Sequence, residues 1–332
     1  MASEIDGRVL ALDIGGTKVG WAVLGCEDRV LDPRENTGAS SGIKMFARGV
    51  MPTDAPKGGE DLARRVAELA AAQVEEHGCV GVAVASAGVV DPETGAIISA
   101  TDTLPGWSGT PLGEILREAT GQPVWIINDV HAHGLGEARL GAGRGSDVVL
   151  SIAVGTGIGG ALIRSGEIDF GAHSLAGHFG HVHHHFGTGI PCSCGRAGHL
   201  EAFASGSGLA TWYNHRSDEA HVANGAELRA LADAGDHLAL ACFSESAYAV
   251  GEVLGSLANC VDPHVIVISG SVANKNGEDW WDNVRAGYAA SAMDGVACVP
   301  LVGGELGDDA PLLGAYQNFM ARTSVDTTEA LS

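Results

Sequence analysis

Apolar and polar residues along this chain follow two periods that point to alternating strands and helices. Short, nearly continuous apolar runs predict buried strands. They occupy residues 9–12, 19–24, 80–85, 124–127, 148–154, 161–163, 265–268 and 297–301. Longer segments with apolar residues at helical spacing predict helices. These occupy residues 59–76, 111–119, 129–140, 201–213, 226–234, 236–261, 280–292 and 310–320. The pattern favours an α/β fold.

The segments between these elements carry their own predictions. Residues 36–60 are rich in Gly, Ser and Pro and are expected to form a loop region. Gly78 is expected to end the helix at 59–76, and Thr110 to cap the helix at 111–119. The tail after Ala321 is expected to fray.

A strand, a glycine-rich turn and a second strand occur twice, at residues 9–24 and 148–163. Glycines let such a turn expose backbone N–H groups to a phosphate, although an ordinary hairpin has the same pattern. The repeat predicts two similar lobes, each with a phosphate-binding hairpin. Gly155–Gly160 also matches G-x-G-x-x-G, but a strand-like run follows where a dinucleotide site requires a helix.

Two carboxylates stand at the ends of predicted strands. Asp13 ends the first strand, where a buried acidic group needs a partner such as hydrated Mg²⁺. Asp129 follows the strand at 124–127 and is either a catalytic base or a helix N-cap. Two phosphate-binding hairpins together with such a base suit phosphoryl transfer.

The stretch at residues 176–201 contains a candidate metal site. Cys192, Cys194 and His199 follow one another closely, and His181 lies upstream. Two thiolates and two imidazoles form the ligand set of a closed, structural zinc site. Residues 183–185 are also histidines, so one of them could replace His181. The alternative is a pair of free buried cysteines beside a histidine-rich surface loop.

Composition narrows the possible partners and the compartment. The 332 residues favour about two domains, and 41 acidic against 19 basic residues give a net charge of −22. So acidic a surface disfavours nucleic acid and membrane as partners. We expect no membrane-spanning segment, and the seven cysteines, mostly in apolar runs, suggest buried thiols in a reducing compartment. The prediction is a cytoplasmic protein.

Six motifs occur in an order that resembles ROK-type sugar kinases, a family of repressors, open reading frames and kinases. They are DIGGTK (Asp13–Lys18), IND (Ile127–Asp129), VGTGIGG (Val154–Gly160), AGHFGH (Ala176–His181), CSCGRAGHLE (Cys192–Glu201) and ISGSVA (Ile268–Ala273). The similarity runs from about residue 8 to residue 320. It implies an actin-like ATPase (ribonuclease H-like) fold whose two lobes close on ATP, Mg²⁺ and a hexose, in a homodimer or homotetramer.

The resemblance also implies a division of the chain. Residues 1–127 would form a small lobe, joined by the C-terminal helix at 310–332. Residues 128–309 would form a large lobe that carries the zinc stretch.

The resemblance assigns roles to individual residues. Asp129 is implied as the base that acts on the sugar 6-hydroxyl. Phosphate or nucleotide contacts are implied for Asp13, Gly15, Gly16, Thr17, Lys18, Gly155, Thr156, Gly157, Gly159, Gly160, Gly270 and Ser271. Sugar contacts are implied for Gly88, Asn128, His181 and Glu201, with Asp102, Thr103 and His178 as candidate selectivity residues.

Two positions depart from the family pattern. His199 replaces the third zinc cysteine and still completes a Cys₂His₂ set. His178 replaces the usual sugar-binding glutamate, and with the sequence SLAGHFGH it resembles N-acetylmannosamine kinases more than glucokinases. Glucose with a neutral change at His178 is the alternative, and N-acetylglucosamine the third.

Two other functional classes are less well supported. A sugar-responsive repressor of the same family needs a DNA-binding domain, whereas only twelve residues precede Asp13 and the net charge is −22. A zinc hydrolase needs an open coordination position, which two Cys and two His would fill.

Overall fold

The computed structural model describes residues 7–26, 42–101, 104–218 and 221–329. The chain divides into two compact units. Unit 1 contains residues 1–145, 166–176 and 308–332, and unit 2 contains residues 146–165 and 177–307. Each unit contains its own sheet and its own hydrophobic core.

The sheet of unit 1 has the strand order β3-β2-β1-β4-β7. Its strands are β1 (Arg8–Ile14), β2 (Lys18–Cys26), β3 (Ile43–Pro52), β4 (Cys79–Ser86) and β7 (Val124–Asn128). β1 pairs antiparallel with β2, as the hairpin prediction requires, and parallel with β4. The carboxyl ends of β1, β4 and β7 therefore share one edge of the sheet, where Asp13, Ser86 and Asn128 lie.

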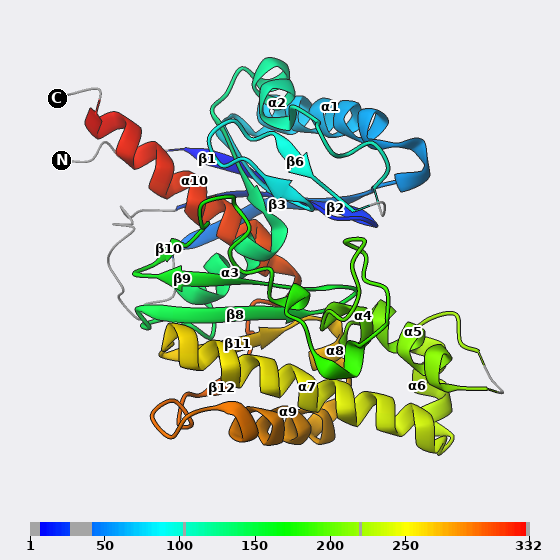
Figure 1. The fold of residues 1–332 in the computed structure, drawn as a ribbon. Coiled ribbons are helices and arrows are strands. Elements are labelled where there is room, and N and C mark those ends of the chain that lie inside the picture. Colours follow the sequence, from blue (N-terminus) through cyan, green and yellow to red (C-terminus); the bar gives the residue numbers. More distant parts are fainter. Residues whose placement is uncertain (1–6, 27–41, 102–103, 219–220, 330–332) are drawn as a thin grey trace. The chain divides into compact units, whose positions relative to one another are not determined.

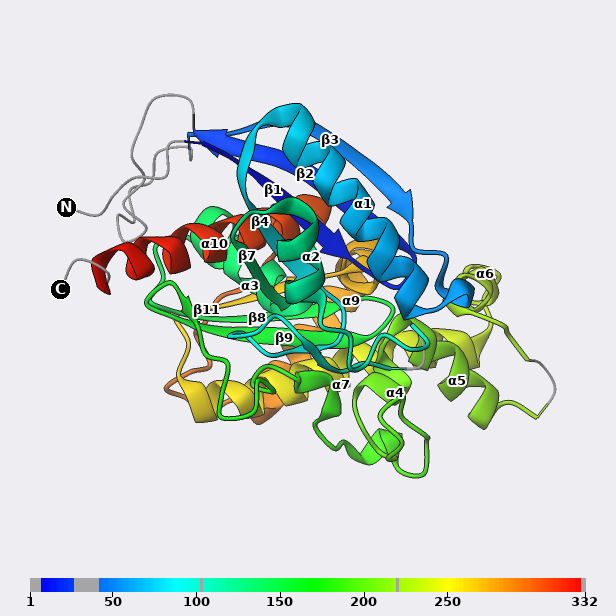
Figure 2. The same ribbon diagram turned by 90° about the horizontal axis from the view of Figure 1, so that it is seen from above.

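Helices cover both faces of this sheet, because successive strand residues point to opposite sides. The helices of unit 1 are α1 (Gly59–His77), α2 (Leu112–Thr120), α3 (Asp129–Leu140) and α10 (Ala310–Glu329). Leu10 and Leu12 pack in one core with Leu62 of α1, whereas Val9 and Ala11 pack in another with α10. The helices can be followed in Figure 1 and, seen from above, in Figure 2.

The second sheet repeats this plan in the order β10-β9-β8-β11-β12, in which β10 (Glu167–Ile168) is a two-residue edge strand. Its other strands are β8 (Val148–Val154), β9 (Ile158–Arg164), β11 (Val265–Ser269) and β12 (Leu301–Gly303). β8 pairs antiparallel with β9 and parallel with β11. Each sheet thus has a hairpin beside a parallel strand, which confirms the repeat predicted from the two glycine-rich turns.

The helices of unit 2 build its core around the same sheet. They are α4 (Glu201–Ala204), α5 (Gly206–Arg216), α6 (Gly225–Asp233), α7 (His237–Val261), α8 (Ser271–Lys275) and α9 (Gly277–Ser291). α7 is the longest of them and packs along α9. Its window of highest hydropathy is long and apolar enough to cross a membrane by length and composition, contrary to our expectation, but 56% of that window is buried inside the protein. That burial is typical of a core helix.

The remaining elements are short. They are the strands β5 (Val89–Val90), β6 (Ile97–Ser99) and β10 (Glu167–Ile168), and the 3-10 turns η1 (Ala55–Lys57), η2 (Phe179–His181), η3 (His185–Gly187) and η4 (Gly307–Asp309). β5 and β6 form a separate two-stranded sheet in unit 1.

Several local predictions need correction. β3 occupies part of the segment expected to be a loop, because its alternating side chains pair it with β2 as an edge strand. Thr110 is not the cap of α2, since Pro111 holds that position and makes no side-chain cap. α10 continues to Glu329, past the expected start of fraying at Ala321. Gly78 ends α1 in the left-handed conformation, as predicted.

The division into units also differs from the expected boundary after residue 127. α3 belongs to unit 1, where it packs against α10. A Cβ at Gly314 would lie 1.7 Å from the carbonyl oxygen of Ala132, and one at Gly136 would lie 2.4 Å from that of Ala310. The two glycines let the helix backbones touch, and this close packing holds residues 128–145 in unit 1.

The cysteines fit the predicted pattern only in part. Cys79, Cys192 and Cys242 are buried, but Cys260 and Cys298 are exposed, although the pattern predicted buried thiols. All seven cysteines lie in the described part of the chain as free thiols.

Candidate active site and metal site

The first glycine-rich turn is clamped from behind by Thr53. The Gly15 N–H donates to the Lys18 carbonyl at 3.1 Å and closes the hairpin. The Thr53 hydroxyl donates to the Gly15 carbonyl at 2.6 Å, and its N–H donates to the Thr17 carbonyl at 3.1 Å. Thr53 is fully buried. Sequence reasoning missed this residue because the clamp joins positions more than thirty residues apart.

Lys18 extends from this turn to an acidic partner. Its Nζ lies 2.8 Å from Oδ2 of Asp308, just before α10, and both side chains are exposed. The hydrogen bond to Asp308 raises the pKa of Lys18, and the same contact lowers the pKa of Asp308. Asp308 is a second site residue that the sequence did not indicate. Gly16 and Thr17, partly or fully exposed, complete the turn.

Asp13 occupies the end of β1, beside Gly20 of β2 and Ala85 of β4. Burial, above all, raises its pKa from 3.8 to about 7. The negative charge of Asp129 adds to the rise, while Lys18 opposes it. Such a carboxyl group is costly to ionise in isolation and is suited to a cation.

The raised pKa makes a stability prediction. Below pH 3.8 the buried group carries no penalty, and as pH rises toward 7 the folded state loses stability relative to the unfolded state. Asp13→Asn removes this loss. We expect the free energy of unfolding of the variant, relative to that of the wild type, to increase by about 2–3 kcal/mol from pH 5 to pH 8. Urea unfolding without magnesium or nucleotide measures this difference.

Asp91→Asn is the matched control for this experiment. The Glu93 N–H, the largest cause, lowers the pKa of Asp91, so stability from this carboxylate is present above its unfolded pKa and is lost on acidification. Between pH 5 and pH 8 this carboxylate is ionised in both the folded and the unfolded state, so the free energy of unfolding of Asp91→Asn relative to the wild type should stay constant and should change only at lower pH. If the stability of Asp13→Asn relative to the wild type does not increase with rising pH, the raised pKa of Asp13 is contradicted.

Asn128 decides between the two interpretations of Asp129. The Asn128 side chain caps α3 by accepting from the N–H groups of Val130 and His131, at 3.1 and 3.2 Å. Its Nδ2 donates to the Gly88 carbonyl at 2.8 Å and to Oδ1 of Asp129 at 2.9 Å. The N-cap of α3 is therefore Asn128, and Asp129 is half-buried and held by it.

The same four hydrogen bonds use the full capacity of the Asn128 amide, which is 6% exposed. In this geometry Asn128 positions Asp129 rather than offering a free group to a sugar. Gly88 has a left-handed φ of 96°, and its carbonyl is the acceptor for that amide. Asp102 and Thr103 lie outside the described residues. In the described segment that follows, Trp107 is buried, and its Nε1 donates to the Ala87 carbonyl at 3.1 Å.

The second glycine-rich turn is held by the start of α5. Gly155 N–H donates to the Gly157 carbonyl at 2.9 Å. The Gly206 N–H donates to the Gly155 carbonyl at 2.7 Å, and the Ser207 hydroxyl donates to the Thr156 carbonyl at 2.7 Å. The remaining glycines of the motif, Gly159 and Gly160, lie in β9.

The turn after β11 lies close to the same hairpin. Gly270 precedes α8, and Ser271 is its first residue. Gly270 has a φ of 98°, and a Cβ there would lie 2.4 Å from the Val154 carbonyl oxygen. The backbones at the ends of β8 and β11 thus approach each other, so unit 2 brings together the two predicted nucleotide-binding turns.

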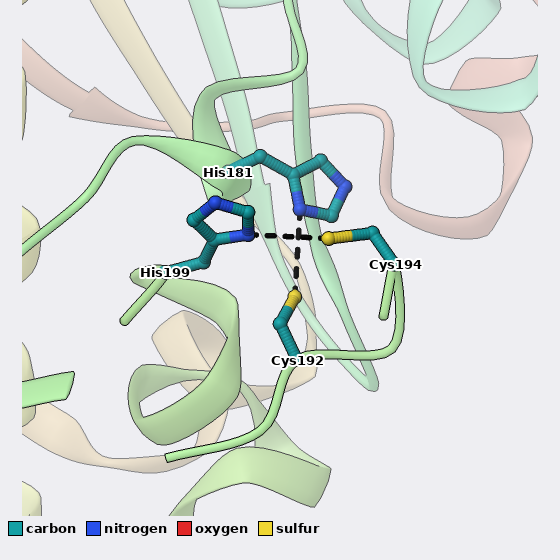
Figure 3. Close-up of side chains that lie close together, drawn as sticks. All are labelled: His181, Cys192, Cys194 and His199. Carbon is teal, nitrogen blue, oxygen red and sulfur yellow. Dashed lines mark hydrogen bonds between the residues drawn. The ribbon is translucent and has the colours of Figure 1, made fainter. Parts of the chain in front are cut away.

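The four predicted metal ligands converge in unit 2. Figure 3 shows the side chains of His181, Cys192, Cys194 and His199 pointing toward one another. Their ligand atoms all lie within 4.8 Å of one another. Nδ1 of His181 is 3.5 Å from the Cys192 sulfur, and Nδ1 of His199 is 3.3 Å from the Cys194 sulfur. A tetrahedral zinc ion with bonds of about 2.1–2.3 Å separates its ligands by about 3.4–3.8 Å, so the donor set fits.

The other three histidines lie apart from this group. His183 is exposed, and its ring packs beside Gly198. His184 is buried, accepts from the Phe186 N–H at Nδ1 and contacts Glu252 through Nε2 at 3.0 Å. His184, His185 and Glu252 form a second candidate metal group. However, a neutral His184 whose Nδ1 accepts a hydrogen bond must carry its proton on Nε2, which blocks that atom as a ligand.

The two remaining predicted sugar residues flank the metal group. The His178 ring is half-buried and stacks on His181, with centroids 6.1 Å apart and planes inclined by 20°. Glu201 begins α4, and its two carboxylate oxygens accept from the Ile158 N–H at 2.9 Å and from the Ser193 hydroxyl at 2.6 Å. Glu201 is thus bound to the second hairpin and to the cysteine loop.

Comparison with known proteins identifies the family. The ROK family model matches residues 9–321. The chain belongs to the ROK family. It is 30% identical to a glucokinase of Halalkalibacterium halodurans, over 92% of each chain. It is 31% identical to an N-acetylmannosamine kinase of Escherichia coli O1:K1, over 81% of this chain and 84% of the relative.

A solved structure supports the fold assignment. The ROK family glucokinase from Streptomyces griseus, in complex with glucose and AMPPNP, is 27% identical. It has a TM-score of 0.72, and the match covers 93% of this chain and 98% of the glucokinase. ROK kinases have the actin-like ATPase fold, so the predicted fold class is confirmed. The repeated sheet plan of the two units agrees with it.

Proposed function

We propose that this ROK-family protein is an ATP-dependent sugar kinase that phosphorylates the 6-hydroxyl of a hexose or amino sugar. The observation that carries the proposal is the group at the edge of the unit 1 sheet. There the half-buried Asp129, held by Asn128, is close enough to Asp13 to raise its pKa. Each unit contains a glycine-rich turn with a clamped backbone.

The proposed chemistry assigns separate tasks to these groups. Asp129 accepts the proton of the sugar hydroxyl as that oxygen attacks the γ-phosphorus of ATP. Asn128 orients Asp129 through its Nδ2, and the Val130 N–H donates to the same carboxylate oxygen at 2.9 Å. The turns at residues 15–18 and 155–160 offer backbone N–H groups to the phosphates, with Gly270 and Ser271 on the nucleotide side. Asp13 would hold Mg²⁺, which offsets phosphate charge when bound.

We also propose that His181, Cys192, Cys194 and His199 hold one structural zinc ion. Support comes from the donor spacing and from the chemistry of the set. Burial raises the pKa of the Cys192 thiol and lowers that of His181. A metal must therefore displace the thiol proton, and it would fix the loop next to His178.

For the substrate we propose N-acetylmannosamine, with glucose as the alternative. The glutamate of glucose-using relatives offers two charged acceptor oxygens, whereas a neutral imidazole at His178 offers one donor and one acceptor. A site built for one polar pattern strongly penalises another. The relatives include a glucokinase and an N-acetylmannosamine kinase at similar identity, so His178 is the residue that favours one sugar over the other.

Turnover with a panel of sugars tests the proposed function directly. The purified protein is incubated with ATP, Mg²⁺ and N-acetylmannosamine, glucose or N-acetylglucosamine in turn, and ADP release is measured. Phosphorylation of one of them at the 6-position supports the proposal. No release above the ATP-only rate with any sugar would reject it. If glucose is the best substrate, the kinase proposal stands and the argument from His178 is wrong.

His178→Glu is expected to change the ranking of these sugars. Restoring a charged, two-oxygen acceptor should shift the ratio of kcat/KM for glucose to that for N-acetylmannosamine toward glucose, by about tenfold or more. His173→Glu is the matched control, because His173 is exposed and is not among the predicted site residues. An unchanged ranking in His178→Glu would show that this residue does not read the sugar.

We further propose a cytoplasmic homodimer or homotetramer. The acidic composition and the free thiols agree with that compartment. Sedimentation velocity of the purified chain measures the oligomeric state.

A further inference from the structure

The carboxylate of Glu201 joins two parts of unit 2 that are distant in sequence. One oxygen accepts from the backbone N–H of Ile158 at 2.9 Å, immediately after the second glycine-rich turn. The other accepts from the hydroxyl of Ser193 at 2.6 Å, and Ser193 stands between Cys192 and Cys194. A single side chain thus connects the turn at residues 155–158 to the cysteine loop.

The fit between Glu201 and the turn is close. A Cβ at Gly157 would lie 2.7 Å from Oε2 of Glu201. Gly157 does not have a left-handed φ, so its backbone conformation alone does not require glycine. Position 157 favours glycine because a side chain there would collide with the Glu201 carboxylate.

Glu201 is also surrounded by predicted metal ligands. His199 lies two residues before it, and Ser193 is fixed at both ends by cysteines whose sulfur atoms belong to the ligand group. When a metal holds both sulfurs, the Ser193 backbone has little freedom, and its hydroxyl stays directed at Glu201. The contacts therefore connect the order of the metal loop to the order of the turn.

We propose that Glu201 is a positioning residue that braces the second phosphate-binding turn and, through Ser193, makes its order depend on the metal loop. The brace acts on the nucleotide side, separately from any contact with the sugar. In unit 1 the buried Thr53 has the equivalent task, since it holds the first turn through the Gly15 carbonyl. The term phosphate-binding rests on the proposed function, but the brace itself does not.

Amide hydrogen exchange of the metal-loaded protein measures the brace without nucleotide or sugar. In Glu201→Ala the Ile158 amide loses a charged acceptor, and its exchange should become about tenfold faster or more. Glu201→Gln keeps an acceptor oxygen and should restore most of the protection. Amides of β11, such as that of Ile266, report whether the core is intact. Unchanged exchange at Ile158 in Glu201→Ala would overturn the proposal.

The link through Ser193 has its own comparison. Ser193→Ala leaves both cysteines in place and should speed exchange at Ile158 about threefold. Ser256→Ala is the matched control, because the Ser256 hydroxyl is exposed and donates only to the Glu252 carbonyl of its own helix. Metal removal should speed exchange at Ile158 in the wild type but add little in Glu201→Ala. An equal effect of metal removal in both proteins would reject the link.

Binding of AMPPNP with Mg²⁺, in the absence of sugar, tests the consequence for nucleotide. We expect Glu201→Ala to weaken binding about tenfold. We also expect Gly157→Ala to weaken AMPPNP binding when it is made in the wild type. When it is added to Glu201→Ala, it should cause no further loss, because the carboxylate that the alanine side chain would meet is gone. A dissociation constant within twofold of wild type in Glu201→Ala would reject the positioning role. A failure to phosphorylate any sugar would reject the proposed function and leave the exchange result standing.

Discussion

The Asp129→Ala variant is expected to lose a factor of about 10²–10⁴ in kcat while it keeps its fold and binds AMPPNP. Removing the base leaves the sugar hydroxyl without a proton acceptor at the moment of attack. The helix end loses only the Asp129 acceptor of the Val130 N–H, which still donates to the Asn128 cap. Steady-state kinetics and a thermal melt on the same preparation check both parts of the prediction.

Asn128→Ala is the informative partner of that variant. It removes the cap, at a cost of about 1 kcal/mol, and also frees the carboxylate of Asp129. Asn128→Ala should therefore lower both Tm and kcat, whereas Asp129→Ala should lower kcat alone. Turnover of Asp129→Ala within about tenfold of wild type would show that Asp129 is not the base.

Loss of the metal is expected to have the second large effect, and it should act on stability before chemistry. The four candidate ligands come from three separate parts of an irregular segment. This segment has little regular secondary structure that could hold it together once the metal is lost. Cys192→Ser should lower Tm by about 5–10 °C, which corresponds to a few kcal/mol for a protein of this size. Elemental analysis of protein purified without added metal should find one zinc per chain.

Cys260→Ser is the matched control for the metal ligands. Cys260 is an exposed free thiol at the end of α7, outside the ligand group. The Cys260→Ser variant should melt at the wild-type temperature and keep its zinc. The metal site would be contradicted by the absence of stoichiometric zinc, or by a Cys192→Ser variant that melts at the wild-type temperature.

Both glycine-rich turns are held by side chains that lie far away in the sequence. The first is clamped by Thr53 of the segment after β3, and the second by Glu201 and Ser207 of the α4–α5 segment. A glycine-rich turn has little stiffness of its own, because its residues have many accessible conformations. The clamps supply the order that the glycines lack.

The sequence by itself determined the features that depend on neighbouring residues. Apolar runs and glycine turns placed both hairpins, because a buried strand and a tight turn are each specified within a few positions. The spacing of Cys192, Cys194 and His199 predicted three members of the candidate metal group for the same reason. The motif order placed Asp13 and Asp129 at strand ends, where the structure has them.

Only the tertiary structure decided the features that depend on distant contacts. From its sequence, the segment of β3 was predicted to be a loop. Its antiparallel pairing with β2 makes it an edge strand. Thr53, Asp308 and Ser193 became site residues through hydrogen bonds to positions from 8 to 290 residues away. Asn128 rather than Asp129 became the helix cap through its own side-chain geometry. α3 joined unit 1 because Gly136 and Gly314 let it touch α10, a contact between residues that no local pattern connects.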